Sequence, residues 1–240
     1  MTSGPGPARR DHALVLGDGD PPTRAGLDAA WPGWDDAVAL VVAADGGARL
    51  AGSLGVDVDI WVGDGDSLTA TEIDALASGR TRIERVPAAK DESDLELAVA
   101  RALEAGCTQI TVLGALGGPR LDHELANVLL LAHPAATGVG ACVELVDARA
   151  RVSLVTAPGV DGRPVRRELP GRVGDLVSLL PLAGDVDGVT THGLRYPLGD
   201  EPLVVGPARG LSNVRLAPDA AVTVRAGRLL VVETPATLDS

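Results

Sequence analysis

The feature that most constrains the fold is a change of pattern near residue 148. Before it, short apolar runs alternate with helical patterns; after it, short apolar runs follow one another, separated by Gly, Pro and Asp. Alternating strands and helices are typical of a parallel α/β sheet, whereas successive short strands are typical of a β-sandwich. We therefore predict a loose tail over residues 1–11, an α/β domain over 12–147 and an all-β sandwich domain over 148–240.

Six β-rich runs are the predicted strands of the α/β domain. Several are apolar without a period of two, as expected for strands that helices cover on both faces. Between two of them, "SDLELAVARALEAG" has its apolar residues on one stripe and stops at Gly106, which predicts a helix. The strand runs are "HALVLG", "AVALVVAAD", "DIWVGD", "TRIERVP", "TQITVLGA" and "ACVELVD".

Composition narrows the function classes. The chain has 45% hydrophobic residues and no Phe, so Val, Leu and Ala must build its core. A net charge of −12 argues against a nucleic-acid partner, although an acidic protein can bind an anion together with a metal. The two cysteines are too few for a disulfide framework. No leader-like or membrane-spanning apolar run is visible, so we expect a cytoplasmic protein without membrane association.

Glycines and aspartates follow one predicted strand after another, where ligands of a parallel sheet bind. In "WVGDGDSL", Asp64 and Asp66 are two residues apart and face the same way if the strand geometry persists. Their oxygens suit a hard cation such as Mg2+. The alternative is a polar turn whose aspartates cap the next helix, and the motif alone does not choose between the two.

The next motif, "ADGGARLAG", has two interpretations as well. Asp45 is a possible cap for the helix that follows. Alternatively, Gly46 and Gly47 let the backbone approach a phosphate at the positive end of that helix.

In "KDESD", the spacing predicts a capping box with Asp91 as N-cap and Asp94 at the third helical position. Lys90, just before it, offers a point charge that suits a phosphate. A solvated lysine is the simpler alternative.

The run "GALGGPRLDHELANVLLL" favours an anion site. Gly114, Gly117 and Gly118 lead into a helix whose first turn holds Arg120 and Asp122. Free backbone N–H groups and a forked cation are suited to bind an anion there.

Helical spacing divides this last helix into two faces. A polar stripe, Arg120, His123 and Asn127, is expected to face the sheet edge or solvent, with His123 either a structural hydrogen-bonding residue or part of the site. The apolar stripe is expected to face the core, and it comprises Leu121, Leu125, Val128 and Leu129.

An anion cradle and a carboxylate cluster at one sheet edge are compatible if a metal lies between them. This combination indicates a nucleoside triphosphate whose phosphates carry Mg2+. The P-loop motif is absent, so a P-loop enzyme is not expected.

These motifs, in this order and at similar spacing, resemble those of the thiamine pyrophosphokinase family. They are "ADGGARLAGSLGVDVDIWVGDGDSL", "KDESDLELAV" and "GALGGPRLDHELANVLLL", and the later "GDLVSLLPL", "GVTTHGLRYPL" and "GLSNVRL" resemble the family's C-terminal half. The resemblance covers nearly the whole chain. It implies a Mg2+-dependent homodimeric enzyme that transfers the pyrophosphoryl group of ATP to thiamine, giving thiamine diphosphate and AMP.

The resemblance also implies roles by position. The metal and triphosphate would be held by Asp45, Asp64, Asp66 and Asp94. The remaining ATP-binding residues would be Gly46, Gly47, Lys90, Asp91, Gly114, Gly117, Gly118 and His123. Arg120 and Asp122 would serve the phosphate and alcohol side, with Asp122 our hypothesis for orienting or deprotonating the hydroxyl. In the second domain, Ser212 and Asn213 would form the thiamine pocket, and Tyr196 would stack on the substrate ring across the dimer interface.

Three departures from the family pattern are visible. Gly65 stands where an aromatic residue is frequent, Ser93 where threonine is usual, and Tyr196 where several relatives carry tryptophan. None removes a metal ligand, and a tyrosine still offers a π face to a cationic ring. An ordinary strand aromatic filling an apolar gap is the alternative for Tyr196.

Three rival functions remain open from the sequence. The first is the same transfer to another alcohol, such as a hydroxymethylpterin. The second is a non-catalytic nucleotide-binding relative that binds ATP and releases no AMP. The third is a metal-dependent phosphodiesterase, against which the lack of a His-rich two-metal cluster argues.

Overall fold

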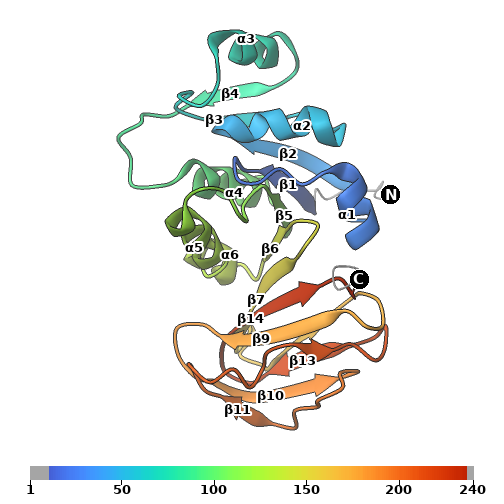
Figure 1. Cartoon of the computed structure of the whole chain (residues 1–240). Helices are drawn as coiled ribbons and strands as arrows, with labels where there is room; N and C mark the ends of the chain where they lie inside the picture. The colour runs from blue at the N-terminus through green and yellow to red at the C-terminus, as the bar shows by residue number, and fades with distance from the viewer. Residues whose placement is uncertain (1–10, 237–240) are drawn as a thin grey trace, which may run out of the picture.

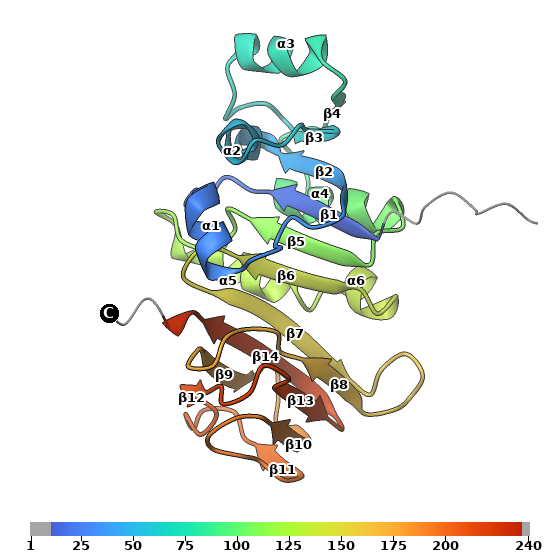
Figure 2. The same cartoon turned by 90° about the vertical axis from the view of Figure 1, so that its right-hand side faces the viewer.

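The computed structural model describes residues 11–236, so the predicted tail lies almost wholly outside the described residues. The described chain forms a ten-stranded mixed sheet and a four-stranded sheet (Figures 1 and 2). An α/β half occupies one end of the molecule and an antiparallel sandwich the other, as the sequence predicts.

All six predicted strands of the α/β half are confirmed. They pair in parallel in the order β6-β5-β1-β2-β3-β4, so β1 lies between β5 and β2. Their bounds are β1 His12–Leu16, β2 Val38–Ala44, β3 Ile60–Gly63, β4 Arg82–Arg85, β5 Gln109–Leu113 and β6 Cys142–Val146.

Helices cover both faces of this parallel sheet (Figure 2). Apolar residues of α4, α5 and α6 pack on one face with Val15, Val42 and Val112, and those of α1, α2 and α3 pack on the other with Leu14 and Trp61. The bounds are α1 Arg24–Ala30, α2 Ala48–Leu54, α3 Ala70–Ser78, α4 Asp94–Glu104, α5 Leu121–Leu130 and α6 Pro134–Gly138.

The helix predicted in "SDLELAVARALEAG" is confirmed as α4, but its predicted cap is wrong. Ser93 is the N-cap, and its hydroxyl accepts a hydrogen bond from the Glu96 N–H at 3.1 Å. Asp91 therefore lies outside the helix, and Asp94 is its first residue. The cap consists of the Ser93 hydroxyl alone, because the Glu96 carboxylate lies 3.3 Å from His133 Nε2.

The predicted orientation of α5 is wrong for its three leucines but confirmed for Val128, which packs against the core. Leu121, Leu125 and Leu129 are 67%, 54% and 57% exposed. The inward face instead carries Glu124 and Asn127, whose side chains bond to backbone groups of the loop after β5. The leucine stripe of α5, Leu121, Leu125 and Leu129, therefore faces solvent.

The sandwich grows directly from the parallel sheet. Strand β7 pairs antiparallel with β6, and the ten-stranded sheet continues as β7-β14-β9-β12, faced by the sheet β11-β10-β13-β8. The predicted boundary at 147/148 falls in the β6–β7 turn. The bounds are β7 Arg151–Ala157, β8 Val165–Glu168, β9 Leu176–Pro181, β10 Val186–His192, β11 Glu201–Leu203, β12 Asn213–Val214, β13 Ala221–Val224 and β14 Gly227–Thr234. No apolar run marks β8, because its sequence, VRRE, is mostly charged.

Candidate active site

The loops that follow β1, β2, β3 and β5 meet at the carboxyl edge of the parallel sheet. Close packing there requires glycine: a Cβ on Gly47 would lie 2.1 Å from the Leu16 carbonyl oxygen, and one on Gly17 would lie 2.7 Å from that of Gly114. The loop after β1 is held in place by hydrogen bonds from Gly17 N–H to Leu113 and from Gly19 N–H to Gly114. The ends of β1, β2 and β5 are therefore packed together, and β3 joins them, because a Cβ on Gly63 would lie 2.8 Å from Asp45 Cβ.

Three aspartates form a cluster at this edge. Asp45, Asp64 and Asp66 each offer a carboxylate oxygen within 4.8 Å of the others, at a spacing that could hold a metal ion. The Asp64 carboxylate also accepts the Asp66 N–H at 3.0 Å, which closes the turn. The capping alternative does not hold for the following helix, because Thr69 caps α3. Carboxylate oxygens in this arrangement suit a hard divalent cation.

Asp45 differs from the other buried acids of the described chain. Among residues 11–236, four carboxylates are buried: Asp45, Asp147, Asp175 and Glu233. The last three have a donor on each oxygen. Asp45 is 5% exposed and accepts one hydrogen bond, from Ser67 N–H at 3.2 Å, while its Oδ1 has no partner. A buried anionic oxygen without a donor is costly unless a ligand completes it.

Asp45 does not cap α2, which was one of its two predicted roles. The N-cap of α2 is Gly47, without a side-chain cap, and Asp45 lies in a 3-10 turn at a positive φ of 41°. Gly46 and Gly47 serve close packing, since a Cβ on Gly46 would lie 2.3 Å from an Asp18 carboxylate oxygen. The conformation holds the Asp45 carboxylate toward β3 and its loop.

Asp94 is not one of the three clustered aspartates. Its carboxylate pairs with Lys90 at 3.0 Å, and both side chains are largely buried. Asp91 is exposed in the loop before α4. Lys90 is thus held by a carboxylate and is not the freely solvated lysine of the simpler alternative.

The glycine loop after β5 is shaped for close approach. Gly114, Gly117 and Gly118 all have positive φ, between 68° and 90°. The Gly117 N–H is already bonded to Glu124 Oε1 at 2.9 Å, so this donor is not free as the sequence suggested. Asn127 donates to the Ala115 carbonyl at 2.8 Å and secures the other side of the loop.

The first turn of α5 carries an exposed ion pair. Arg120 donates to Asp122 Oδ1 at 2.9 Å and also contacts its second oxygen. The Arg120 guanidinium holds the pKa of the Asp122 carboxyl far below its usual range. His123 is exposed. An ionised carboxylate of such low pKa orients groups well but accepts a proton poorly.

The predicted thiamine-pocket residues lie together in the sandwich. Asn213 is buried, and its amide bonds both backbone groups of Tyr196: Oδ1 accepts the Tyr196 N–H at 3.0 Å, and Nδ2 donates to the Tyr196 carbonyl at 2.7 Å. The Tyr196 ring is 64% exposed. Ser212 is exposed, and its N–H donates to Ser178 Oγ. Asn213 therefore holds Tyr196 in place, which leaves the ring available.

Sequence reasoning missed two charged residues beside the cluster. Asp18, in the loop after β1, interacts electrostatically with Asp45 and Asp66. Arg49, on α2, donates to Glu72 at 2.7 Å and to the Ser67 carbonyl at 2.8 Å, and its charge acts on Asp18 and Asp45. The signal for Asp18 was present, because "GDGDPP" after the first strand repeats the pattern of "GDGDS" after the third.

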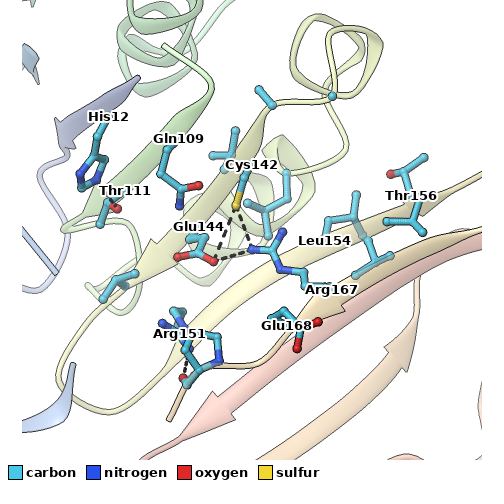
Figure 3. Close-up of a pocket in the computed structure, with 18 of the residues that line it drawn as sticks. His12, Gln109, Thr111, Cys142, Glu144, Arg151, Leu154, Thr156, Arg167 and Glu168 are labelled. Carbon is cyan, nitrogen blue, oxygen red and sulfur yellow. Dashed lines mark hydrogen bonds and ion pairs between the residues drawn. The ribbon is translucent and has the colours of Figure 1, made fainter. Parts of the chain in front are cut away.

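A separate cavity of about 1150 Å³ lies at the other ends of the strands (Figure 3). Its lining includes the first residues of β1, β5 and β6, which are His12, Gln109 and Cys142. Arg167 from β8 crosses it to contact Glu144 and Cys142. Glu144 therefore has a partner within the chain, unlike Asp45 Oδ1 at the carboxyl edge.

No helix within residues 11–236 is long and apolar enough to cross a membrane.

Comparison with known proteins connects both halves of the chain to one activity. Residues 33–143 match the family model described as thiamin pyrophosphokinase, catalytic domain, and residues 165–231 match thiamin pyrophosphokinase, vitamin B1 binding domain. The chain is similar to thiamine pyrophosphokinase of Bacillus subtilis (strain 168), with 25% identity over 202 residues, which cover 84% of this chain and 90% of that protein.

Solved structures agree in fold. The crystal structure of the Bacillus subtilis thiamine pyrophosphokinase matches with a TM-score of 0.76 and 22% identity, covering 94% of this chain and 99% of that one. A thiamin pyrophosphokinase family protein from Enterococcus faecalis matches with a TM-score of 0.74 and 25% identity, covering 93% of this chain and 98% of that one. Thiamin pyrophosphokinase from Candida albicans matches with a TM-score of 0.72 and 14% identity, covering 96% of this chain and 95% of that one.

Proposed function

The chain belongs to the thiamin pyrophosphokinase family, and we propose that its cluster of Asp45, Asp64 and Asp66 binds Mg2+ together with the triphosphate of ATP. The chain acts as a thiamine pyrophosphokinase, which makes thiamine diphosphate and AMP from thiamine and ATP. The vitamin B1 binding match over residues 165–231 supports thiamine over a pterin alcohol as the acceptor.

One observation carries the proposed metal site. Asp45 Oδ1 is buried without a donor, and oxygens of Asp64 and Asp66 lie within 4.8 Å in the same group. The donor set is all oxygen, which fits Mg2+ and not a softer metal. When bound, Mg2+ would neutralise charge on the phosphate oxygens during transfer.

Around this cluster, the contacts of the remaining residues indicate their roles in the proposed ATP site. Lys90, held by Asp94, and Arg120, held by Asp122, supply the positive charges that face the phosphates. The backbone of Gly46, Gly47, Gly114, Gly117 and Gly118, with Asp91 and His123 at the rim, forms the rest of the ATP site. Transfer would join the thiamine hydroxyl oxygen to the β-phosphorus and break the bond to AMP. Positioning and charge supply most of such catalysis.

Asp122 has a narrower role in this proposal than deprotonating the hydroxyl. Its pKa lies far below the usual range because Arg120 holds it ionised, so it is a weak base. We propose that Asp122 fixes the Arg120 guanidinium and orients the hydroxyl by accepting its hydrogen bond. The proton then leaves to solvent or to a phosphate oxygen.

We propose a homodimer in which the second domain of one subunit completes the site of the other. The exposed ring of Tyr196 offers a π face to the cationic ring of thiamine, with Ser212 and the buried Asn213 beside it. The leucine stripe of α5 is an exposed apolar surface that a second copy could cover. We place the enzyme in the cytoplasm, where ATP is available.

The experiment that tests the proposal is a product assay by mass spectrometry. Thiamine, ATP and Mg2+ should give thiamine diphosphate and AMP, and Asp64→Asn should abolish both. A hydroxymethylpterin serves as the alternative acceptor. Transfer to the pterin alone would overturn the thiamine assignment, and ATP binding without AMP release would indicate a non-catalytic relative. Full activity in a chelator would overturn the role of Mg2+.

A further inference from the structure

We propose that Asp18 is a fourth carboxylate of the cation site, contributed by the loop after β1. The inference rests on the proposed function and extends it to a residue outside the part of the chain that the catalytic-domain match covers, which begins at residue 33.

The position of this loop in the sheet is the first observation. Because β1 lies between β5 and β2, the loop after it separates the aspartates that follow β2 and β3 from the glycine loop that follows β5. Any ligand that spans the two must pass over residues 17–20. Asp18 is the exposed acid at the cluster side of that passage.

Tight packing fixes where Asp18 lies. A Cβ on Gly19 would lie 2.7 Å from the Gly114 carbonyl oxygen, and one on Gly46 would lie 2.3 Å from Asp18 Oδ2. The Asp18 carboxylate therefore rests against the residue next to Asp45. The backbone on its other side is bonded to the β5 loop by the N–H groups of Gly19 and Asp20.

The charges around the Asp18 carboxylate determine whether a triphosphate can lie beside it. Three charged groups act on Asp18: Arg49 attracts its carboxylate, and Asp45 and Asp66 repel it. Arg49 itself is held by Glu72. A carboxylate beside two others, on the path of a triphosphate, repels that anion unless a cation stands between them.

The bare oxygen of Asp45 is the independent sign that a ligand belongs here. Asp45 is 5% exposed, its Oδ1 has no donor, and its carboxylate belongs to the group with Asp64 and Asp66. Asp18 lies outside this group of three but near enough to interact electrostatically with Asp45 and Asp66, so it reaches the cation through one of the waters that Mg2+ usually keeps.

The test measures cation binding without turnover. Mn2+ is titrated into the full chain, free Mn2+ is followed by electron paramagnetic resonance, and Mg2+ is used as competitor. Variants Asp18→Asn, Asp64→Asn and Asp20→Asn are compared with wild type. Asp20→Asn is the matched control: it removes the same charge from the same loop, but Asp20 acts on Arg149. Asp18 is exposed and asparagine has the same shape, so folding should persist.

We expect Asp18→Asn to weaken Mn2+ binding about 10-fold, as supporting ligands usually do, and Asp20→Asn to change it less than 2-fold. Weakening by Asp64→Asn but not by Asp18→Asn overturns the role of Asp18 and leaves the proposed function intact. Equal weakening of Mn2+ binding by Asp18→Asn and Asp20→Asn also overturns it, because loss of any negative charge from the loop would then explain the effect. Unchanged binding in all three variants overturns the proposed cation site itself.

Discussion

Two buried acids, one in each half of the molecule, have opposite surroundings. In the sandwich, Glu233 is 3% exposed, and each of its oxygens pairs with an arginine, Arg151 on one and Arg215 on the other. At the carboxyl edge of the parallel sheet, Asp45 is 5% exposed and has one weak backbone donor and a bare oxygen. A buried acid with all partners within the chain serves the fold. A buried acid that lacks one is kept for a ligand.

The largest expected effect is on stability. Glu233→Gln leaves the fully buried Arg215 without its carboxylate, which should lower the free energy of unfolding by about 3–5 kcal/mol. Urea denaturation measures this. The folded fraction should keep its kcat, since Glu233 lies in the sandwich and away from the cluster. If Glu233→Gln lowered kcat without lowering the free energy of unfolding, Glu233 would not differ from Asp45 as proposed.

Asp45→Asn should have the opposite profile. Removing one ligand charge should reduce kcat/KM by about 10³-fold, or ~4 kcal/mol of transition-state stabilisation. The free enzyme should be no less stable, because the variant relieves repulsion with Asp64 and Asp66. Steady-state kinetics and urea denaturation on the same preparations check both parts. Strong destabilisation with normal kinetics would make Asp45 a structural residue like Glu233.

The leucine stripe of α5 is an exposed apolar surface, and we propose that a second subunit covers it. Leu125→Glu should weaken subunit association by about 30-fold, or ~2 kcal/mol, as expected for a central interface residue. Sedimentation equilibrium measures the dissociation constant. Val160→Glu, at a residue that is 76% exposed in the sandwich, is the control. Equal association constants for wild type and Leu125→Glu would remove the stripe from the interface.

Tyr196 and Asn213 allow the same comparison within one hydrogen-bonded pair of residues. Tyr196→Leu should raise the KM for thiamine about 10-fold through loss of the cation–π contact, with unchanged melting temperature. Asn213→Ala should raise that KM as well and also lower the melting temperature, because two backbone groups of Tyr196 lose their partner. Unchanged KM in Tyr196→Leu would contradict the stacking role.

The smallest expected effect concerns Glu72, an acid paired at the surface. Arg49 lowers its pKa from 4.5 to about 2, with Thr69 adding to the effect. Because the pKa is lower in the folded state, the stabilising contribution is present above pH 4.5 and is lost as the pH falls toward 2. The melting-temperature difference between wild type and Glu72→Gln should therefore shrink below pH 4.5. Glu92→Gln is the control. A melting-temperature difference between wild type and Glu72→Gln that grows as the pH falls would contradict this prediction.

The strands and the meeting of their loops were predictable, because they depend on local patterns and on the rules of parallel sheets. Strand ends rich in Gly and Asp indicated where Asp64 and Asp66 would lie. The bare oxygen of Asp45 was not predictable, since it depends on the absence of donors from every neighbouring element.

Other features depended on side-chain competition that periodicity does not reveal. On α5, Glu124 and Asn127 take inward positions and bond to the loop after β5, while Leu121 and Leu125 are exposed. The capping of α4 by Ser93 in place of Asp91 is a similar competition between neighbouring residues. Asp18 was visible as a motif, but its place beside Asp45 follows only from the strand order.

The most direct test of the central claim, that Asp45 is kept for a cation, is a crystal structure with Mn2+ and α,β-methylene-ATP. An anomalous-difference map should place Mn2+ in contact with Asp45 Oδ1 and with an oxygen of Asp64 or Asp66, beside the triphosphate. A map that places Mn2+ and nucleotide elsewhere, with Asp45 Oδ1 bonded only to protein donors, would contradict the account.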